Sequence, residues 1–249
     1  HVQIVADELH NDQGLLLSGG DMYLAGRDIV NRRGNIYSLG SLLVEAQGRE
    51  GISSRFGNLS GTVEAAGDVW IQADHIENIR EEFDIRTYKY SARLVHVGCI
   101  KCSGTNEDAL LRLDDIDRTE VTRNSPQSEL LSGGNLLLQA DQIDNWYSLL
   151  AAANNMHLVA GQVENRGAQV GDVFQSRVLH SHRVRAHRVG YQINDANAFT
   201  ARNWHERSSY NPGNISAELN SFINTHIQGI RSSSEPVVSN VEYHHGTIQ

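Results

Sequence analysis

The 249-residue sequence is short of proline, cysteine, aromatic side chains and positive charge, and it has no long apolar run. It holds 3 Pro and 2 Cys, and aromatic residues make up 6% of the chain. No stretch approaches the roughly 20 consecutive apolar residues of a membrane-spanning helix, so such a helix is not expected. The 21 Lys and Arg are outnumbered by 30 Asp and Glu, which gives a formal net charge of −9. Because phosphate contacts need clustered Lys and Arg, we expect no nucleic-acid partner.

Glycine is plentiful instead, with 22 residues, and a segment of twelve residues that opens on Gly or Asn is repeated along the chain. The segment occurs four times, beginning at Gly20, Gly67, Gly134 and Asn154. With the first residue of each copy numbered zero, positions 2, 4 and 9 are apolar, position 6 is small and position 11 is Asn. A small residue then follows three positions after the Asn, and an apolar one two positions further. The Asn residues at this register are Asn11, Asn31, Asn58, Asn78, Asn145 and Asn165.

This periodicity predicts an all-β fold made of stacked repeats. Alternation of apolar and other residues over a few positions is the period of a β-strand with one buried face. A 20-residue unit cannot enclose a core alone, but stacked units can, as in a parallel β-helix or solenoid. Coils of about 20 residues would each rise by about 4.8 Å. A helical solenoid is excluded, because apolar residues do not recur at the spacing of a helical face.

The column of asparagines has two interpretations. Asn enters the left-handed backbone conformation at less cost than most residues, so each Asn could belong to an independent turn. Alternatively, stacked Asn amides hydrogen-bond to one another or to the turn backbone and form a ladder. We favour the ladder, because six Asn at one register are difficult to obtain from turns that do not stack.

The register of the repeat fails in two places before it ends. The third Asn of the column comes seven residues late, at Asn58, which indicates a small solvated loop before it. After Asn78 the cycle resumes only near Ser125. We predict that the intervening residues, 79–124, form a β-hairpin or small sheet that projects from the stack, because part of this stretch alternates as strands do.

The pattern stops after Gly171, and this point sets the main predicted boundary. Residues 1–171 are predicted to be the repeat domain that carries the insertion. Residues 172–249 are predicted to be a non-repetitive β/α cap, with a helix at 215–227 where apolar residues fall on one helical face. Because the chain begins in the middle of a repeat, we expect it to be a piece of a longer protein.

The two cysteines, Cys99 and Cys102, form a C-x-x-C pair in a polar, Gly-containing part of the insertion. A structural zinc site needs four ligands, and no second pair is present. A redox motif would normally open a helix after a strand, whereas this one lies in a loop. We predict a disulfide that closes the tip of the hairpin, the form that such a pair takes in an oxidising environment. Free or reactive thiols and a metal site are the alternatives.

Other polar residues could in principle bind a metal or a partner, or take part in catalysis. The histidines of residues 173–189 could bind a metal, but an exposed strand facing a partner is the favoured interpretation, because no acidic ligand is interleaved. The arginines there suit either an acidic partner or a solvated edge strand. Asp21 and Asp68 share one repeat position, where Asn135 and Asn155 replace them, so we interpret them as turn caps. We predict no enzyme activity, no catalytic residue, no cofactor and no metal.

The repeat resembles the haemagglutinin repeat of filamentous haemagglutinin-like exoproteins. The resemblance lies in the N-x-x-G motif followed by GDMYLAGRDIVN and its copies. The resemblance covers roughly residues 1–78 and 125–171. It implies a right-handed parallel β-helix, a long filament exported through an outer-membrane transporter, and display at a Gram-negative cell surface. Members include adhesins and contact-dependent growth-inhibition toxins. In the toxins, a segment that follows the first run of repeats binds the receptor. The resemblance therefore implies that residues 172–249 are either the cap of the repeats or a receptor-binding region.

We therefore expect a secreted, monomeric, non-catalytic exoprotein fragment that displays a recognition surface at the bacterial cell surface. Its partner would be an outer-membrane protein or a surface glycan on a target cell, in contact-dependent growth inhibition. The alternatives are an adhesin shaft that binds host cells or glycans, a carbohydrate-active β-helix enzyme, and a purely structural shaft. Aromatic and Arg side chains carry most interface energy. On that ground the receptor-binding candidates are Tyr88, Tyr90, Lys101, Arg183, Arg185, Trp204 and Tyr210.

Overall fold

The computed structural model consists of β-strands wherever an element has described bounds. It describes residues 1–48, 51, 53–101, 105–185, 194, 221, 224 and 229–249. The predicted helix at 215–227 therefore lies almost entirely outside the described residues. Among those that are described, no helix has the length and apolar character needed to cross a membrane. The prediction of an all-β fold with parallel strands is confirmed.

The chain divides into two compact units, which are described separately. Unit 1 comprises residues 1–84, 121–169 and 243–249, and unit 2 comprises residues 85–120 and 170–242. This division differs from the predicted boundaries at 79–124 and 172–249. The inserted segment and the C-terminal region share one unit, and the last seven residues return to unit 1.

Unit 1 is built from three columns of parallel strands, and each repeat contributes one strand to each column. The first column contains β1 (Val2–Val5), β4 (Met22–Gly26), β7 (Leu42–Ala46), β10 (Val69–Gln72) and the first halves of β15 (Leu136–Trp146) and β17 (Met156–Arg166). The second contains β2 (Glu8–Asp12), β5 (Asp28–Arg32), β8 (Arg55–Leu59), β11 (His75–Ile79) and the second halves of β15 and β17. Because β15 and β17 run through both columns, the two form one ten-stranded sheet.

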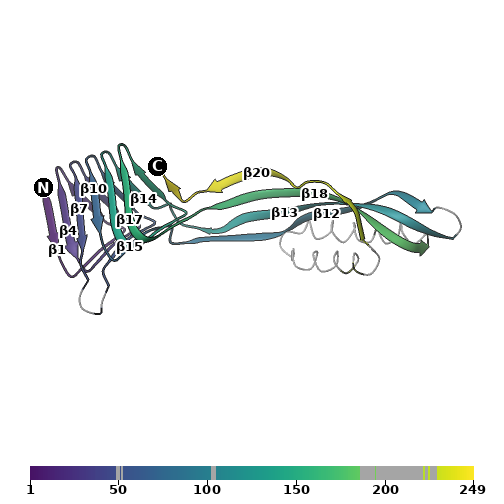
Figure 1. Ribbon diagram of the computed structural model, residues 1–249, viewed down its shortest axis with the longest axis horizontal. Helices are drawn as coiled ribbons and strands as arrows, with labels where there is room; N and C mark the ends of the chain where they lie inside the picture. The colour runs from purple at the N-terminus through teal and green to yellow at the C-terminus, as the bar shows by residue number, and fades with distance from the viewer. Residues whose placement is uncertain are drawn as a thin grey trace. The chain divides into compact units, whose positions relative to one another are not determined.

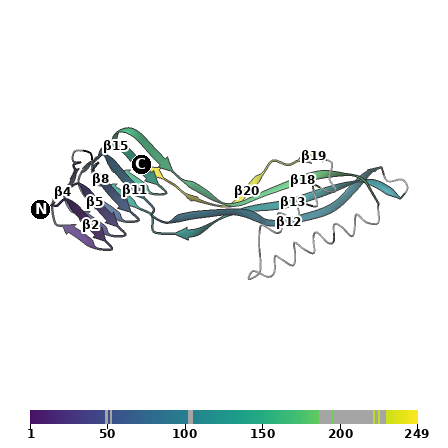
Figure 2. The ribbon, with the colours of Figure 1, turned by 90° about the horizontal axis from the view of Figure 1, so that it is seen from below.

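The third column is a separate six-stranded sheet. It contains β3 (Leu15–Ser18), β6 (Asn35–Ser38), β9 (Thr62–Ala65), β14 (Glu129–Ser132), β16 (Leu149–Ala152) and β21 (Thr247–Ile248). Figure 1 shows strands of the first column side by side, and Figure 2 shows those of the second. Strands that are distant in sequence are thus neighbours in space.

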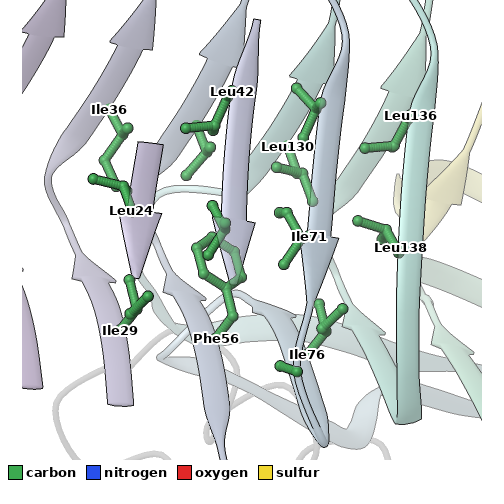
Figure 3. Packing of buried hydrophobic residues seen from close by; sticks show 14 of the residues in the cluster. Leu24, Ile29, Ile36, Leu42, Phe56, Ile71, Ile76, Leu130, Leu136 and Leu138 are labelled. Atoms are coloured by element: carbon green, nitrogen blue, oxygen red, sulfur yellow. The ribbon is translucent and has the colours of Figure 1, made fainter. Parts of the chain in front are cut away.

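The register explains why the alternating pattern produces a core. Equivalent repeat positions pair directly, so that Leu24 pairs with Val44 and Ile71 pairs with Leu138. Since successive side chains of a strand point to opposite faces, equal register stacks all apolar positions on the same inner face. Figure 3 shows side chains of all three columns converging on one interior. Burying one such aliphatic side chain contributes about 1.5–3 kcal/mol, so these columns dominate the stability of unit 1.

Two long segments leave unit 1 at the same point of the repeat, between its second and third columns. One leaves after β11 and returns at β14, and the other leaves after β17 and returns at β21. The returning strand pairs Ile248 with Leu150, the register that the sequence pattern had assigned to Val170. Val170 lies instead in β18 (Ala168–Arg185), within unit 2. The pattern did not separate the two, because each is an apolar residue two positions after a small one.

Aromatic and cationic side chains brace the roots of these segments within unit 1. The ring of Phe83 lies 4.4 Å from that of Tyr147 and 4.8 Å from that of His244, measured between centroids. Arg80 stacks over Phe83 at 5.2 Å and contacts Nδ1 of His244 at 3.1 Å. Residues that are far apart in sequence are thereby tied together where the chain enters and leaves the stack.

Unit 2 is a different kind of sheet, with five strands. They are β12 (Phe83–Lys101), β13 (Asn106–Asn124), β18, β19 (Gly229–Ser233) and β20 (Val237–His244). The order is β12-β13-β18-β19, and β20 pairs with β18 (Figure 1). β13 and β18 are antiparallel, with Leu111 opposite Leu179. The inserted segment was predicted to form a β-hairpin or small sheet that projects from the stack. Its two strands share one sheet with strands of the C-terminal region, a pairing that was not predicted.

Candidate functional site

The asparagine column forms a continuous buried ladder. The Nδ2 atom of Asn31 donates to Oδ1 of Asn58 at 2.9 Å, and that of Asn58 donates to Oδ1 of Asn78 at 2.9 Å. The same amide groups donate to the carbonyl three residues further on, as from Asn31 to Gly34 at 2.9 Å. Asn11, Asn145 and Asn165 continue the series in both directions. A buried amide left unpaired costs about 1–3 kcal/mol, so this column holds the turns together and belongs to the scaffold.

Asp21 and Asp68 belong to a second ladder, at the turn before the first column. Oδ1 of Asp21 accepts the backbone N–H of Ser41 at 2.9 Å, and Oδ1 of Asp68 accepts that of Asn135 at 2.7 Å. Oδ1 of Asn135 accepts the backbone N–H of Asn155 in the same way, at 3.3 Å. Carboxylate and amide oxygens do the same work at this position, which is that of a turn cap.

The outer face of the first column carries a line of apolar and aromatic side chains. The line consists of residues that pair with one another across neighbouring strands, namely Tyr23, Leu43, Trp70 and Leu137. Part of this line borders a groove of about 490 Å³, together with Asp21, Asp68 and Ser41. The Tyr23 hydroxyl donates to Oε2 of Glu45 at 2.6 Å, and this hydrogen bond raises the pKa of Tyr23 above its ordinary value. The sequence reasoning missed this groove, although four outward apolar positions in register were visible in the repeat.

A second groove of about 500 Å³ follows the corner between the first two columns, where the repeat places small residues. Ala46, Ala73, Ala140 and Ala160 line it, and so do the polar side chains of Gln72, Gln139, Asp74 and Asp141. The backbone N–H of Asp141 donates to the carbonyl of Asp74 at 3.0 Å, so the two acidic residues occupy neighbouring repeats. Oδ2 of Asp74 accepts the backbone N–H of Ser54 at 2.6 Å, which gives this carboxylate a role in holding the turn.

The outer face of the second column is charged, unlike that of the first. Arg55 pairs with Glu77 and lies 4.0 Å from Oδ1 of Asp28. His75 contacts buried Asp144, with 2.9 Å between Nε2 and Oδ2. Arg55 thereby offsets part of the negative charge that Asp28 and Glu77 bring from the neighbouring repeats.

Unit 2 is braced by ion pairs with buried carboxylates. Asp172 accepts two hydrogen bonds from Arg118, at 2.6 and 2.7 Å, and the guanidinium lies 3.2 Å from the centroid of the Tyr90 ring. The Arg118 guanidinium lowers the pKa of Asp172 below its ordinary value of 3.8. Asp115, which is 2% exposed, accepts bonds from Lys89 and Arg177, each at 2.6 Å. These pairs join β12, β13 and β18.

The predicted receptor-binding residues have different positions in the structure. The Tyr88 hydroxyl donates to Glu120 at 3.0 Å, and Tyr90 lies beneath Arg118, so both rings have partners within unit 2. Lys101 ends β12, and Arg183 and Arg185 lie near the end of β18. Trp204 and Tyr210 lie outside the described residues. The contact of these seven residues with a receptor stays a prediction.

The predicted cysteine and histidine sites are placed in part. Cys99 is disulfide-bonded. The only other cysteine of the chain is Cys102, which lies outside the described residues. His180 lies in β18 opposite Leu110. In the described part of the chain, no group of three or more His, Cys, Asp or Glu side chains is arranged to hold a metal ion.

Comparisons of this chain with protein-family models, with curated proteins and with solved structures find no match. The function is therefore argued from the two units themselves. Unit 1 offers regular columns and two grooves, and unit 2 offers a non-repetitive sheet.

Proposed function

We propose that this chain is a non-catalytic part of a large secreted exoprotein of the filamentous haemagglutinin-like kind. In this proposal unit 1 is a right-handed parallel β-helix of about 20 residues per coil. Three columns of parallel strands, their equal register and the buried Asn ladder support the β-helix. Unit 2 is the recognition surface for a receptor on a target cell, in contact-dependent growth inhibition.

The observation that carries the proposal is the way in which unit 2 arises from the repeats. Two segments leave the regular stack at the same turn, and together they build one antiparallel sheet. The columns of the stack continue through both departures, so the scaffold keeps its register while the departing chain is free to vary. This arrangement suits display, because recognition residues are concentrated on loops and insertions held by a rigid scaffold.

Unit 2 exposes large apolar side chains that a receptor could cover. Ile85, Val97, Ile100 and Phe174 are between 38% and 47% exposed. Buried ion pairs hold the sheet that carries them, so these side chains are presented with little loss of entropy on binding. The partner in this proposal is an outer-membrane protein, and the parent protein reaches the bacterial surface through an outer-membrane transporter partner. The protein acts as a monomer and needs no cofactor.

The test is binding of the fluorescently labelled protein to candidate target cells, measured by flow cytometry. Ile85→Asp and Phe174→Asp should each weaken binding by about tenfold or more, as expected when an interface anchor becomes charged. Leu17→Asp is the matched control, because Leu17 is 56% exposed on the third column of unit 1. Equal binding by all three variants would contradict the proposal and favour a purely structural shaft.

The corner groove supports a second hypothesis, a carbohydrate-active enzyme, because glycosidases use paired carboxylates. Asp74 and Asp141 line that groove in neighbouring repeats. We retain the prediction of no enzyme activity, because Asp74 caps a turn through its bond from Ser54. The enzyme hypothesis is tested by incubating the protein with polysaccharides. If the wild type released reducing ends and Asp141→Asn did not, the enzyme would be established and our prediction would be overturned.

A further inference from the structure

The groove on the outer face of the first column is lined by aromatic and aliphatic side chains. Trp70, which is 46% exposed, lines it together with Tyr23 and Leu43. The residues stack in register across three consecutive repeats, so the groove crosses the strands of β4, β7 and β10. The neighbouring second column presents charged side chains such as Arg55 and Glu77 at its outward positions, whereas these three side chains are apolar or aromatic. A concave site of about 490 Å³ that combines apolar and aromatic side chains with a few polar groups has the size and lining typical of a ligand-binding site.

The apolar floor of the groove meets a rim of hydrogen-bonding groups. Asp21, Ser41 and Asp68 line the same groove, one from each of three repeats. Each carboxylate uses Oδ1 to cap the next turn, and for both of them the structure pairs only that oxygen. Oδ2 of each is therefore available to accept a hydrogen bond from a ligand. The Ser41 hydroxyl accepts the backbone N–H of Asp68 at 3.1 Å and keeps its own hydrogen to donate.

We infer that this groove binds an uncharged glycan. An aromatic ring with adjacent carboxylate and hydroxyl groups matches a sugar, which has an apolar face of C–H groups and a periphery of hydroxyl donors. Charge selects against acidic ligands, because Asp21 and Asp68 outweigh the N-terminal ammonium of His1 among the lining residues, and the protein has a net charge of −9. Sulfated, sialylated and phosphorylated ligands would meet two carboxylates of like charge. The inference goes beyond the proposed function, since it gives unit 1 a ligand of its own.

Binding is tested by saturation-transfer NMR on the 249-residue protein with a panel of uncharged oligosaccharides built from glucose, galactose, mannose and N-acetylglucosamine. Heparin disaccharides serve as the anionic comparison. We expect transfer to at least one uncharged oligosaccharide and none to heparin. In Trp70→Ala the affinity for that oligosaccharide should fall about tenfold or more, the loss of about 1.4 kcal/mol. Leu137→Ala is the matched control, because Leu137 is the next residue of the same outward column and does not line the groove.

The rim is tested by Asp21→Asn combined with Asp68→Asn. Oδ1 of Asn135 already accepts the equivalent backbone N–H, that of Asn155, so the double variant should keep the turns intact. It should gain measurable binding of heparin disaccharide, because the repelling charges are removed. Circular dichroism of each variant confirms that the fold is kept.

The inference is overturned by any of three results: no uncharged oligosaccharide binds, Trp70→Ala and Leu137→Ala weaken binding equally, or heparin binds the wild type more tightly than the uncharged sugars do. Peptide or protein capture that Trp70→Ala abolishes, without glycan binding, would also overturn it. The proposed function fails by a different result, the insensitivity of cell binding to the Ile85 and Phe174 variants in unit 2.

Discussion

The β-sheets of the two units are stabilised by different kinds of interaction. Unit 1 repeats one solution, in which apolar columns fill the interior and an Asn ladder satisfies the turns. Unit 2 has no repeat, and its antiparallel strands are joined by ion pairs such as Arg118–Asp172. Each stacked position of unit 1 accepts only residues of the type that the repeat specifies. In unit 2, by contrast, each contact involves its own pair of residues and is not repeated. In this chain the repeated columns form a regular scaffold, and the segment without repeats forms a sheet with contacts that occur only once.

The largest expected effect is the loss of a core residue from unit 1. Phe56 is fully buried and is the largest side chain of the core. Phe56→Ala should lower the free energy of unfolding of unit 1 by about 4 kcal/mol, because a large cavity is left among packed columns. Chemical denaturation followed by hydrogen exchange separates the two units. If unit 2 lost as much stability as unit 1, the independence of the two units would be contradicted.

Removing an amide from the middle of the ladder should be the next largest effect. Asn58 donates to Asn78 and to the carbonyl of Gly61, and it accepts from Asn31. Asn58→Ala leaves buried groups unpaired on both sides, and we expect a loss of about 3 kcal/mol in unit 1. Urea unfolding measures it. Asn155→Ala is the control, because the bonds of Asn155 are exposed to water. Equal losses in the two variants would show that burial of the ladder is unimportant.

Unit 2 should respond to acid through Asp172. Its pKa is lowered in the folded protein, so the carboxylate binds protons more weakly there than in the unfolded chain. The stabilisation is therefore complete above the unfolded pKa, near pH 4, and is lost as the pH falls through the folded pKa. Asp172→Asn should cost about 2 kcal/mol at pH 7 and progressively less below pH 4. A difference between wild type and variant that stays constant from pH 7 to pH 2 would rule out this ion pair as the cause.

An outward residue of the stack should matter least. Leu17 is 56% exposed on the third column and lies outside both grooves. Leu17→Thr keeps a residue that suits a strand, so the free energy of unfolding should change by no more than about 0.5 kcal/mol. Thermal unfolding measures it. A loss above 2 kcal/mol would mean that this face is covered in the folded protein.

Much of unit 1 could be predicted from its sequence, because stacking makes equal positions neighbours. The period placed Ile71 against Leu138 and Asn31 against Asn58 before any contact was known. The same reasoning failed at the end of the repeats. Val170 fits the pattern, yet Ile248 occupies the position, and no local rule reveals a strand that returns after a long excursion.

Unit 2 and the outer groove were harder to predict, for two physical reasons. The partners of β18 lie in the inserted segment, and pairing between strands of different segments has no period to reveal it. Asp172 and Arg118 gave no pattern either, because an ion pair depends on geometry that sequence spacing does not contain. The groove at Trp70 was visible only as outward apolar residues, which a search for the core passes over.

The most direct test of the central claim is hydrogen exchange of the protein bound to outer-membrane extract of a susceptible target cell. The claim is that unit 1 is the scaffold and unit 2 is the surface that meets the receptor. We expect new protection at residues 85–100 and 170–180, with the exchange of residues 53–79 unchanged. Protection confined to the columns of unit 1, with unit 2 exchanging as in the free protein, would contradict the account.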